Sequence, residues 1–154
     1  MQDGQRITPF ITFEKNGKQA VDFYVSIFKN STINSLMVMP GGDQLLHASF
    51  TLDGMKFMAM DAGPEFNFAR GSSLFVTCQD QAEVDYYWEK LGENGEYEPC
   101  GWLKDKYGMS WQIVPTALGK LMSGPDPAKS GRVMQSMLQM SKLDIAGLQA
   151  AYDQ

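Results

Sequence analysis

One pattern occurs twice in this sequence: Phe10-Ile11-Thr12-Phe13 and then Val21-Asp22-Phe23-Tyr24 return as Phe75-Val76-Thr77-Cys78 and then Val84-Asp85-Tyr86-Tyr87. A further correspondence follows, because Gly54 and Gly108 each precede an apolar segment. A repeat of this length determines topology before any single residue is considered. The sequence therefore predicts two halves with the same fold, and two halves that face each other would enclose a pocket.

The length and composition are those of one globular domain. At 154 residues, we expect the repeat to be built into a single domain, residues 1–154. A domain of this size can bury roughly 70% of the surface that its unfolded chain exposes, so it needs neither a metal nor a disulfide, and an apolar fraction of 44% agrees with a globular protein. Cys78 and Cys100 match no paired zinc-ligand spacing, so we expect reduced thiols.

Charge and hydropathy exclude two classes of partner. Thirteen basic against eighteen acidic residues give a net charge of -5, with no cluster of Lys and Arg that could follow a phosphate backbone. No apolar run approaches the roughly 20 residues that span a bilayer, and residues 1–5 lack a charged and then apolar leader. We therefore expect no nucleic-acid partner, no membrane partner and a cytoplasmic location.

Periodicity predicts the same order of elements in each half. Asp53-Gly54 is a strong two-residue hairpin signal, and Asn16 can cap the first helix. Module one, residues 7–61, has an expected strand over 7–13, a helix over 18–28, and strands over 32–39, 45–52 and 55–61. After a linker of residues 62–71, module two, residues 72–115, has an expected strand over 72–78, a helix over 81–91, and strands over 97–103 and 109–114.

The tail, residues 116–154, belongs to neither half. Asp126 followed by Pro127 is a good helix start, and Asp144 opens a last short helix. Four apolar residues form a stripe along the first of these helices, at Met134, Met137, Leu138 and Met140. Such a stripe indicates core or interface packing more often than a ligand site.

Four runs of sequence carry a resemblance to a known family: 7–10, 21–28, 84–88 and 100–115. With the paired modules, they resemble the PhnB-like proteins of the vicinal oxygen chelate superfamily, which includes glyoxalases, extradiol dioxygenases and bleomycin- or fosfomycin-resistance proteins. The resemblance implies an α+β fold, in which two βαβββ modules form a cupped mixed sheet and a C-terminal helical extension follows.

PhnB-like proteins are often labelled demethylubiquinone 3-methyltransferase-like, and the residues here do not support that activity. A methyltransferase that uses S-adenosylmethionine usually needs a glycine-rich turn between a parallel strand and a helix. Gly41-Gly42 precedes a strand instead, and Gly63-Pro64 leads into a loop. We therefore expect no such cofactor.

In the metal-using members of the superfamily, each module gives one ligand from its first strand and one from its last. Matching the repeats places these positions at Thr8 and Met58 in module one, and at Ser73 and Gln112 in module two. Divalent metal sites draw on imidazole, carboxylate and thiolate, so this set predicts no metal.

The same positions suit a ligand pocket. Thr8, Ser73 and Gln112 can bond a small ligand. The apolar walls would come from Phe10, Met58 and Trp102 or Trp111. The alternative is that all these residues fill the cavity and bond to one another.

His47 and Asp61 are weak candidates for catalysis. A single His on a strand is more often packed than a base, and a carboxylate at a strand end is more often exposed in a turn. Three functions stay open: a metal-free protein that binds a small, partly aromatic molecule; an enzyme with lyase, isomerase or resistance-type chemistry at an atypical metal or acid-base site; and an assembly module. A homodimer is expected under all three.

Overall fold

A computed structural model describes residues 4–68 and 71–154 of the chain. The chain divides into two compact units, Met1–Asn67 and Phe68–Gln154. The expected organisation as a single domain stays a prediction, and two residues of the expected linker, 69 and 70, lie outside the described part.

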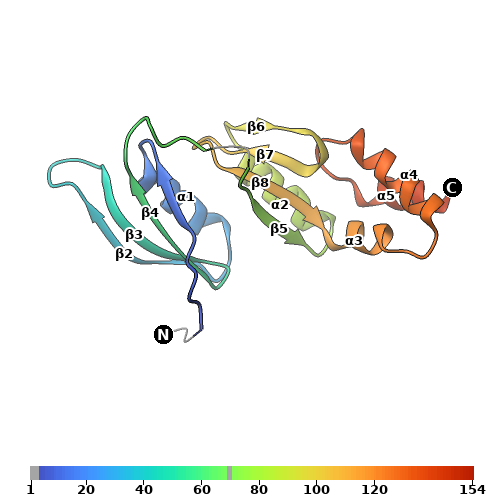
Figure 1. The fold of residues 1–154 in the computed structure, drawn as a ribbon, viewed down its shortest axis with the longest axis horizontal. Coiled ribbons are helices and arrows are strands. Elements are labelled where there is room, and N and C mark those ends of the chain that lie inside the picture. The colour runs from blue at the N-terminus through green and yellow to red at the C-terminus, as the bar shows by residue number, and fades with distance from the viewer. Residues whose placement is uncertain (1–3, 69–70) are drawn as a thin grey trace. The chain divides into compact units, whose positions relative to one another are not determined.

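The first unit is a four-stranded mixed sheet with the order β1-β4-β3-β2 and one helix, α1, on one of its faces (Figure 1). Strand β1 runs parallel to β4, and the other neighbours are antiparallel. The core lies between the sheet and α1, where Val21, Tyr24 and Phe50 are fully buried. The elements are β1 (Phe10–Phe13), α1 (Gly17–Ile27), β2 (Thr32–Val38), β3 (Leu45–Leu52) and β4 (Met55–Asp61).

The hairpin between β3 and β4 forms as the sequence predicts. Asp53 and Gly54 have φ values of 46° and 82°, the left-handed conformation that tight two-residue turns require. This turn fixes the register, which pairs Ser49 with Met58. Every second side chain of the two strands therefore lies on the same face of the sheet.

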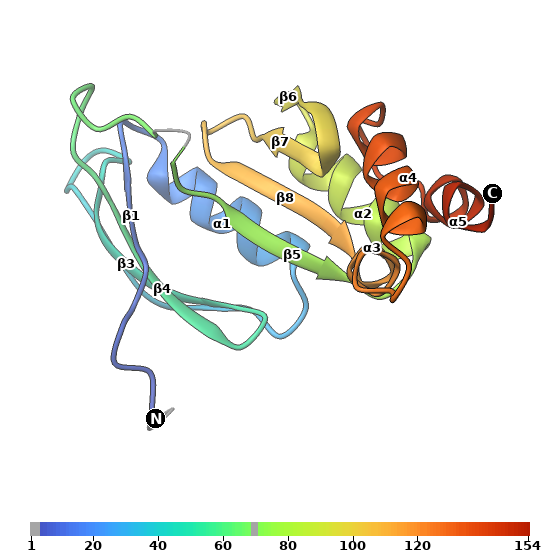
Figure 2. The ribbon, with the colours of Figure 1, turned by 45° about the vertical axis from the view of Figure 1, so that its right-hand side comes forward.

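The second unit contains a sheet of the same design, with the order β5-β8-β7-β6 and β5 parallel to β8. Helix α2 begins after Asp80, whose side chain accepts a hydrogen bond from the Glu83 amide. Figure 2 shows α2 beside β5 and β8. The elements are β5 (Leu74–Cys78), α2 (Gln81–Gly92), β6 (Glu96–Tyr97), β7 (Trp102–Lys104) and β8 (Ser110–Pro115).

The single strand expected over 97–103 is wrong. A short 3-10 turn, Pro99–Gly101, divides it into β6 and β7. Pro99 has no amide hydrogen for a sheet ladder, and Cys100 adopts a left-handed φ of 63°. The correction gives module two three strands after its helix, as in module one.

The repeat is therefore confirmed at the level of topology, and so is the α+β fold of two βαβββ modules. The registers agree as well, because Phe10 pairs with Met58 in the first sheet and Phe75 pairs with Gln112 in the second. Phe10 and Phe75, and likewise Met58 and Gln112, occupy equivalent positions.

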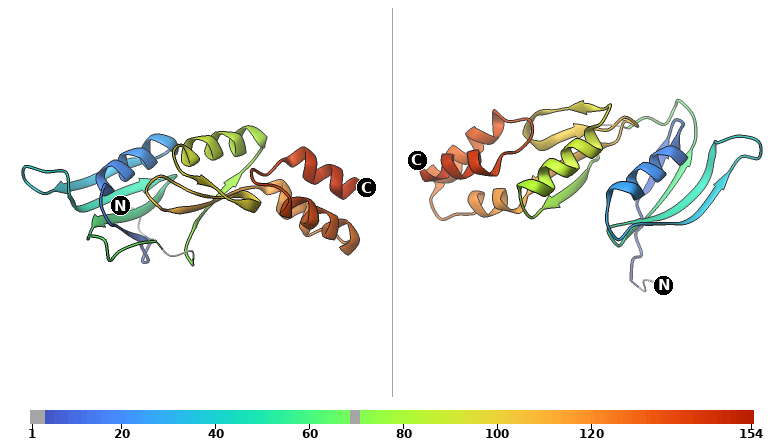
Figure 3. Two further views of the ribbon diagram at one scale, coloured as in Figure 1. Left: turned by 90° about the horizontal axis from the view of Figure 1, so that it is seen from above. Right: turned by 180° about the vertical axis from the view of Figure 1, so that it is seen from behind.

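The C-terminal extension contains three helices, of which the sequence interpretation missed the first. They are α3 (Thr116–Met122), α4 (Pro127–Leu138) and α5 (Ile145–Asp153). Figure 3 shows them beyond the end of β8. Leu121, Val133 and Leu148 form their common core, with one residue from each helix. The signal for α3 was the spacing of Leu118, Leu121 and Met122 directly after β8.

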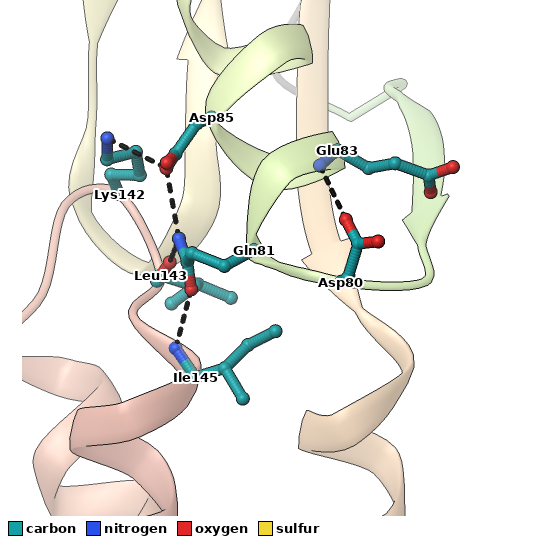
Figure 4. Close-up of polar contacts among 7 residues, drawn as sticks. All are labelled: Asp80, Gln81, Glu83, Asp85, Lys142, Leu143 and Ile145. Carbon is teal, nitrogen blue, oxygen red and sulfur yellow. Dashed lines mark hydrogen bonds and ion pairs between the residues drawn. The ribbon is translucent and has the colours of Figure 1, made fainter.

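Two residues of α2, Gln81 and Asp85, hold the extension. Gln81 donates from Nε2 to the Leu143 carbonyl at 3.1 Å and accepts at Oε1 from the Ile145 amide at 2.8 Å (Figure 4). Lys142 forms an ion pair with Asp85 at 2.9 Å, and Gln81 also donates to Asp85 at 3.0 Å. The hydrogen bond from Gln81, followed by Lys142, lowers the pKa of Asp85.

Within residues 4–68 and 71–154, no helix combines the length and the apolar character that crossing a membrane requires.

Candidate functional site

The face of each sheet opposite its helix, here called the open face, carries most of the predicted site residues. In the second sheet, Gln112 pairs with Phe75 on one side and with Trp102 on the other. These three side chains therefore form a row across the open face. Phe75 is 57% exposed, whereas Ile113, which points the other way, is fully buried.

Ser73 adjoins this row. The Gln112 side chain donates from Nε2 to Ser73 Oγ at 2.9 Å, and both residues are half-buried. The two predicted positions of module two therefore lie together and bond to each other, as one of the two sequence hypotheses states. The bond uses one donor of the amide, which has a second N–H and a carbonyl oxygen for other partners.

Trp111 requires a correction, because it does not lie on the open face. It is 2% exposed and belongs to the core side of the sheet, with Ile113. Its indole Nε1 donates to Asp105 Oδ2 at 2.8 Å. Neighbouring residues of a strand point to opposite faces, so Trp111 and Gln112 cannot line the same surface. Of the two tryptophans predicted as a wall, Trp102 is the one on the open face.

The open face of the first sheet is mainly apolar. Thr8 precedes β1 and is half-buried, and the Met58 amide donates to the Pro9 carbonyl beside it at 3.0 Å. Phe10, the register partner of Met58, is 48% exposed. The predicted positions of module one are therefore neighbours in the sheet.

His47 lies on this same face. Its ring packs against Phe10 with centroids 6.5 Å apart, and its register partner on β2 is Met37, which is 60% exposed. Within the described residues, the imidazole makes no hydrogen bond and no ion pair. His47 is thus a packed residue with free nitrogen atoms, beside the predicted pocket residues of its own unit.

Asp61 is not an exposed turn carboxylate. It is 6% exposed and accepts two backbone hydrogen bonds, from Gly17 to Oδ1 at 2.8 Å and from Leu45 to Oδ2 at 2.9 Å. Asp61 therefore caps α1 and ties it to β3. Asn16, the cap expected from sequence, makes no side-chain cap bond. Both carboxylate oxygens are committed to the backbone, which leaves Asp61 poorly placed as a base.

The four positions equivalent to metal ligands in the superfamily do not fit a metal. They offer two hydroxyls, a thioether and an amide, from Thr8, Ser73, Met58 and Gln112. None of these groups is the imidazole, carboxylate or thiolate that holds a catalytic divalent ion. Among residues 4–68 and 71–154, no cluster of three or more His, Cys, Asp or Glu side chains could hold one elsewhere.

Neither thiol is placed as a nucleophile. Cys78 is fully buried, and burial raises its pKa to about 12, with smaller contributions from Glu83 and Asp80. Cys100 is half-buried, and its Sγ lies 3.7 Å from the Met137 carbonyl. Both are free cysteines.

Strand alternation also shows which open-face residues were missed. In the second sheet these are Phe75 and Thr77 on β5, and Val114 on β8. In the first sheet, Met60 lies beside His47. The repeat itself carried a signal for Phe75, because Phe75 corresponds to Phe10, which was predicted.

A family model described as 3-demethylubiquinone-9 3-methyltransferase matches residues 5–114. A PhnB protein from Bacillus cereus is 36% identical; the match covers 73% of this chain and 100% of that chain, with a TM-score of 0.65. No curated protein matches.

Two more distant structures share the fold. A protein from Pseudomonas aeruginosa is 20% identical, with coverage of 73% and 98% and a TM-score of 0.59. The fosfomycin resistance protein FosX from Listeria monocytogenes, solved with Mn(II) and sulfate, is 16% identical, with coverage of 72% and 90% and a TM-score of 0.51. Because the family model spans most of the chain and the Bacillus cereus relative is similar over the same extent, the chain belongs to the PhnB-like family of the vicinal oxygen chelate superfamily.

Proposed function

We propose that this protein binds a small, partly aromatic molecule without a metal, through the open faces of its sheets. The observation that carries the proposal is the row formed by Phe75, Gln112 and Trp102, with Ser73 bonded to the amide. Two aromatic rings flank a polar pair there. Small-molecule sites commonly combine apolar walls with a few polar groups that fix the orientation of the ligand.

The absence of charge in this row favours a neutral ligand. A carboxylate or phosphate ligand would be poorly held by an amide and a hydroxyl alone, because no cation in the row offsets the cost of removing the anion from water. A phenol or an amide can both donate to and accept from Gln112 and Ser73, and a ketone can accept from them.

Binding to metal-stripped protein tests the proposal. The protein is treated with a chelator, and aromatic phenols, amides and ketones are titrated while tryptophan fluorescence and ligand NMR signals are measured. We expect binding to persist, and the variant Gln112→Leu to bind about tenfold more weakly, the value of one good hydrogen bond. Gln135→Leu, an exposed position on α4, is the matched control. Near-stoichiometric zinc, nickel, iron or manganese in protein purified without chelators contradicts the metal-free proposal.

Methyl transfer is not proposed for this chain. In each unit, the helix that follows the first strand has its N-terminus occupied by a carboxylate of the protein. Asp61 accepts from Gly17 at the start of α1, and Asp80 accepts from Glu83 at the start of α2. A helix N-terminus that already carries a carboxylate attracts a second anionic or polar cofactor group less strongly.

An enzyme that uses His47 as an acid or base is the second candidate. It is favoured by the position of His47 on the open face, next to Phe10 and Met37. His47→Gln separates the two functions: a catalytic role predicts lost turnover of a bound ligand with affinity largely kept. If His47→Gln turns the ligand over as fast as the original protein, or if neither protein turns it over, the catalytic role of His47 is refuted and binding remains the proposed function.

We also propose that the protein is a cytoplasmic homodimer. Met134 and Leu138, two members of the apolar stripe on α4, are 43% and 49% exposed and offer an apolar surface, while Met137 and Met140 pack against the core of the extension. Light scattering at micromolar concentration tests the dimer, and a mass of one chain would contradict it.

A further inference from the structure

A groove lies between α3 and the open face of the second sheet. Its volume is about 400 Å³, within the range of small-molecule sites. The sheet side is formed by Phe75, Thr77 and Val114, and the helix side by Leu118, Gly119 and Met122. The sequence interpretation assigned none of these residues to a site.

The groove is continuous with the polar pair described above. Phe75 and Gln112 are register partners on β5 and β8, and Val114 lies two residues further along β8 on the same face. Two residues along a strand correspond to roughly 6.6 Å. A ligand whose polar group meets Gln112 therefore has its other end directed along the strand, towards α3.

The wall made by α3 is held in place from behind. Leu121 of α3 is buried against Val133 and Leu148, and Leu118 and Met122 also pack against this cluster. Helix α5 is in turn held at its start by Gln81, through the Ile145 amide. The wall thus belongs to a packed structure, which is a condition for selecting ligands by shape.

We propose that this groove is an apolar subsite, and that the C-terminal extension thereby selects neutral ligands that carry a short alkyl or aryl group opposite a polar head. This inference rests on the proposed function, because it assigns the second end of the same ligand. The family model ends at residue 114, so α3 lies outside the region that the family shares.

The occupant is a small molecule because the groove is small. Stable protein interfaces bury about 800 Å² per partner and involve roughly 20–30 residues on each side. Eight residues line this groove. A volume of about 400 Å³ accommodates a substituted ring or a short chain, and it leaves little room for a protein segment.

Gly119 provides a direct test. It lines the groove, and a Cβ added there meets no atom within 4 Å. Gly119→Leu should therefore fill the groove without strain, and it replaces a glycine in a helix with a better helix former. Gly131→Leu is the matched control, because Gly131 lies in α4, also has no atom within 4 Å of an added Cβ, and does not line the groove.

The probes are phenol, 4-ethylphenol and 4-butylphenol, titrated into protein with 13C-labelled methionine methyl groups and 15N-labelled glutamine side chains. The Met122 methyl reports the groove, the Gln112 amide reports the polar pair, and the exposed Met134 methyl is the control signal. We expect affinity to rise about two- to threefold per methylene in the original chain and in Gly131→Leu, since full burial of a methylene gives about fourfold. In Gly119→Leu this dependence should disappear.

The readouts separate this inference from the proposed function. One outcome is that the Gln112 amide signal shifts with all three phenols, the Met122 methyl signal does not shift, and affinity does not change with the length of the alkyl chain. This outcome refutes the subsite and leaves the binding function in place. Another outcome is that the Met122 methyl signal shifts with 4-butylphenol and the Gln112 amide signal does not. The groove is then confirmed as an apolar site, and the polar pair is refuted as the site that binds the polar end of the ligand. If neither signal shifts with any of the phenols, both proposals are refuted. A Met122 shift that follows protein concentration without ligand identifies a second copy as the occupant of the groove and also refutes the subsite.

Discussion

Replacing Asp61 with Asn tests whether this carboxylate is architectural or catalytic. In the structure, its two oxygens accept from the amides of Gly17 and Leu45 at 2.8 and 2.9 Å, and the residue is 6% exposed. Asn keeps one acceptor oxygen and places an NH₂ group against the other amide. One charge-assisted bond is lost, the other becomes neutral, and a buried N–H has no acceptor.

The expected loss follows from these terms. A hydrogen bond to a charged group contributes about 1.5–3 kcal/mol, and a buried donor without a partner costs about 1–3 kcal/mol. Allowing for relaxation, we expect Asp61→Asn to lower the free energy of unfolding by about 3 kcal/mol. In a chain of this length that corresponds to a melting temperature lower by about 6–12 °C. Urea unfolding followed by circular dichroism, with the melting temperature from calorimetry, measures both quantities.

The control is Asp53→Asn, an exposed turn position on the hairpin before β4. Asp53 has a φ of 46°, a conformation that Asn tolerates, so its replacement should change stability by less than about 0.5 kcal/mol. Gly17→Ala disturbs the same hydrogen bond from its donor side, because the added Cβ would lie 2.6 Å from Asp61 Oδ1. This variant should therefore lower the free energy of unfolding as well. A loss below about 1 kcal/mol for Asp61→Asn, or a full loss of turnover at unchanged stability, would refute the architectural role.

Two further predictions concern the extension and the thiols. Gln81→Ala removes two hydrogen bonds to the extension, so opening of α5 should become easier by about 2 kcal/mol, roughly a 30-fold faster hydrogen exchange of its amides. Lys142→Ala, which breaks a surface ion pair beside it, should change exchange less than about fivefold, and equal effects would contradict the role of Gln81. In the folded protein, iodoacetamide should modify Cys78 at least roughly 100-fold more slowly than Cys100, because burial and a pKa of about 12 leave little thiolate. Equal rates, measured by peptide mass spectrometry, would contradict the burial of Cys78.

The fold was largely predictable because its signals are local or repeated. The bounds of β3 and β4 follow from alternation and from the Asp53-Gly54 turn, and the second module follows from the first. Two of the errors in the predicted elements have local causes. The strand over 97–103 was predicted through Pro99, which cannot take part in a sheet ladder. Helix α3 was missed because it begins directly at the end of β8, without a loop to mark it.

The site was predictable only in part. Matching the repeats placed Met58 and Gln112 at equivalent register positions, and the same alternation rule should have separated Trp111 from Gln112. The role of Asp61 was beyond sequence reasoning, because Gly17 precedes it by 44 residues and no local pattern joins the two. A groove formed by a helix that was not predicted could not be predicted either.

The buried carboxylates of the two modules are bound to other groups of the protein. Among the described residues, the buried acids are Asp61 and Asp105. Asp61 binds two backbone amides, and Asp105 accepts from the amides of Tyr107 and Met109 and from the Trp111 indole. Each acid therefore stabilises the fold of its own module, Asp61 at the end of β4 and Asp105 in the segment before β8. At the four positions that correspond to metal ligands in the superfamily, this chain carries uncharged side chains, and the row of Phe75, Gln112 and Trp102 supports the proposal of an uncharged, partly aromatic ligand.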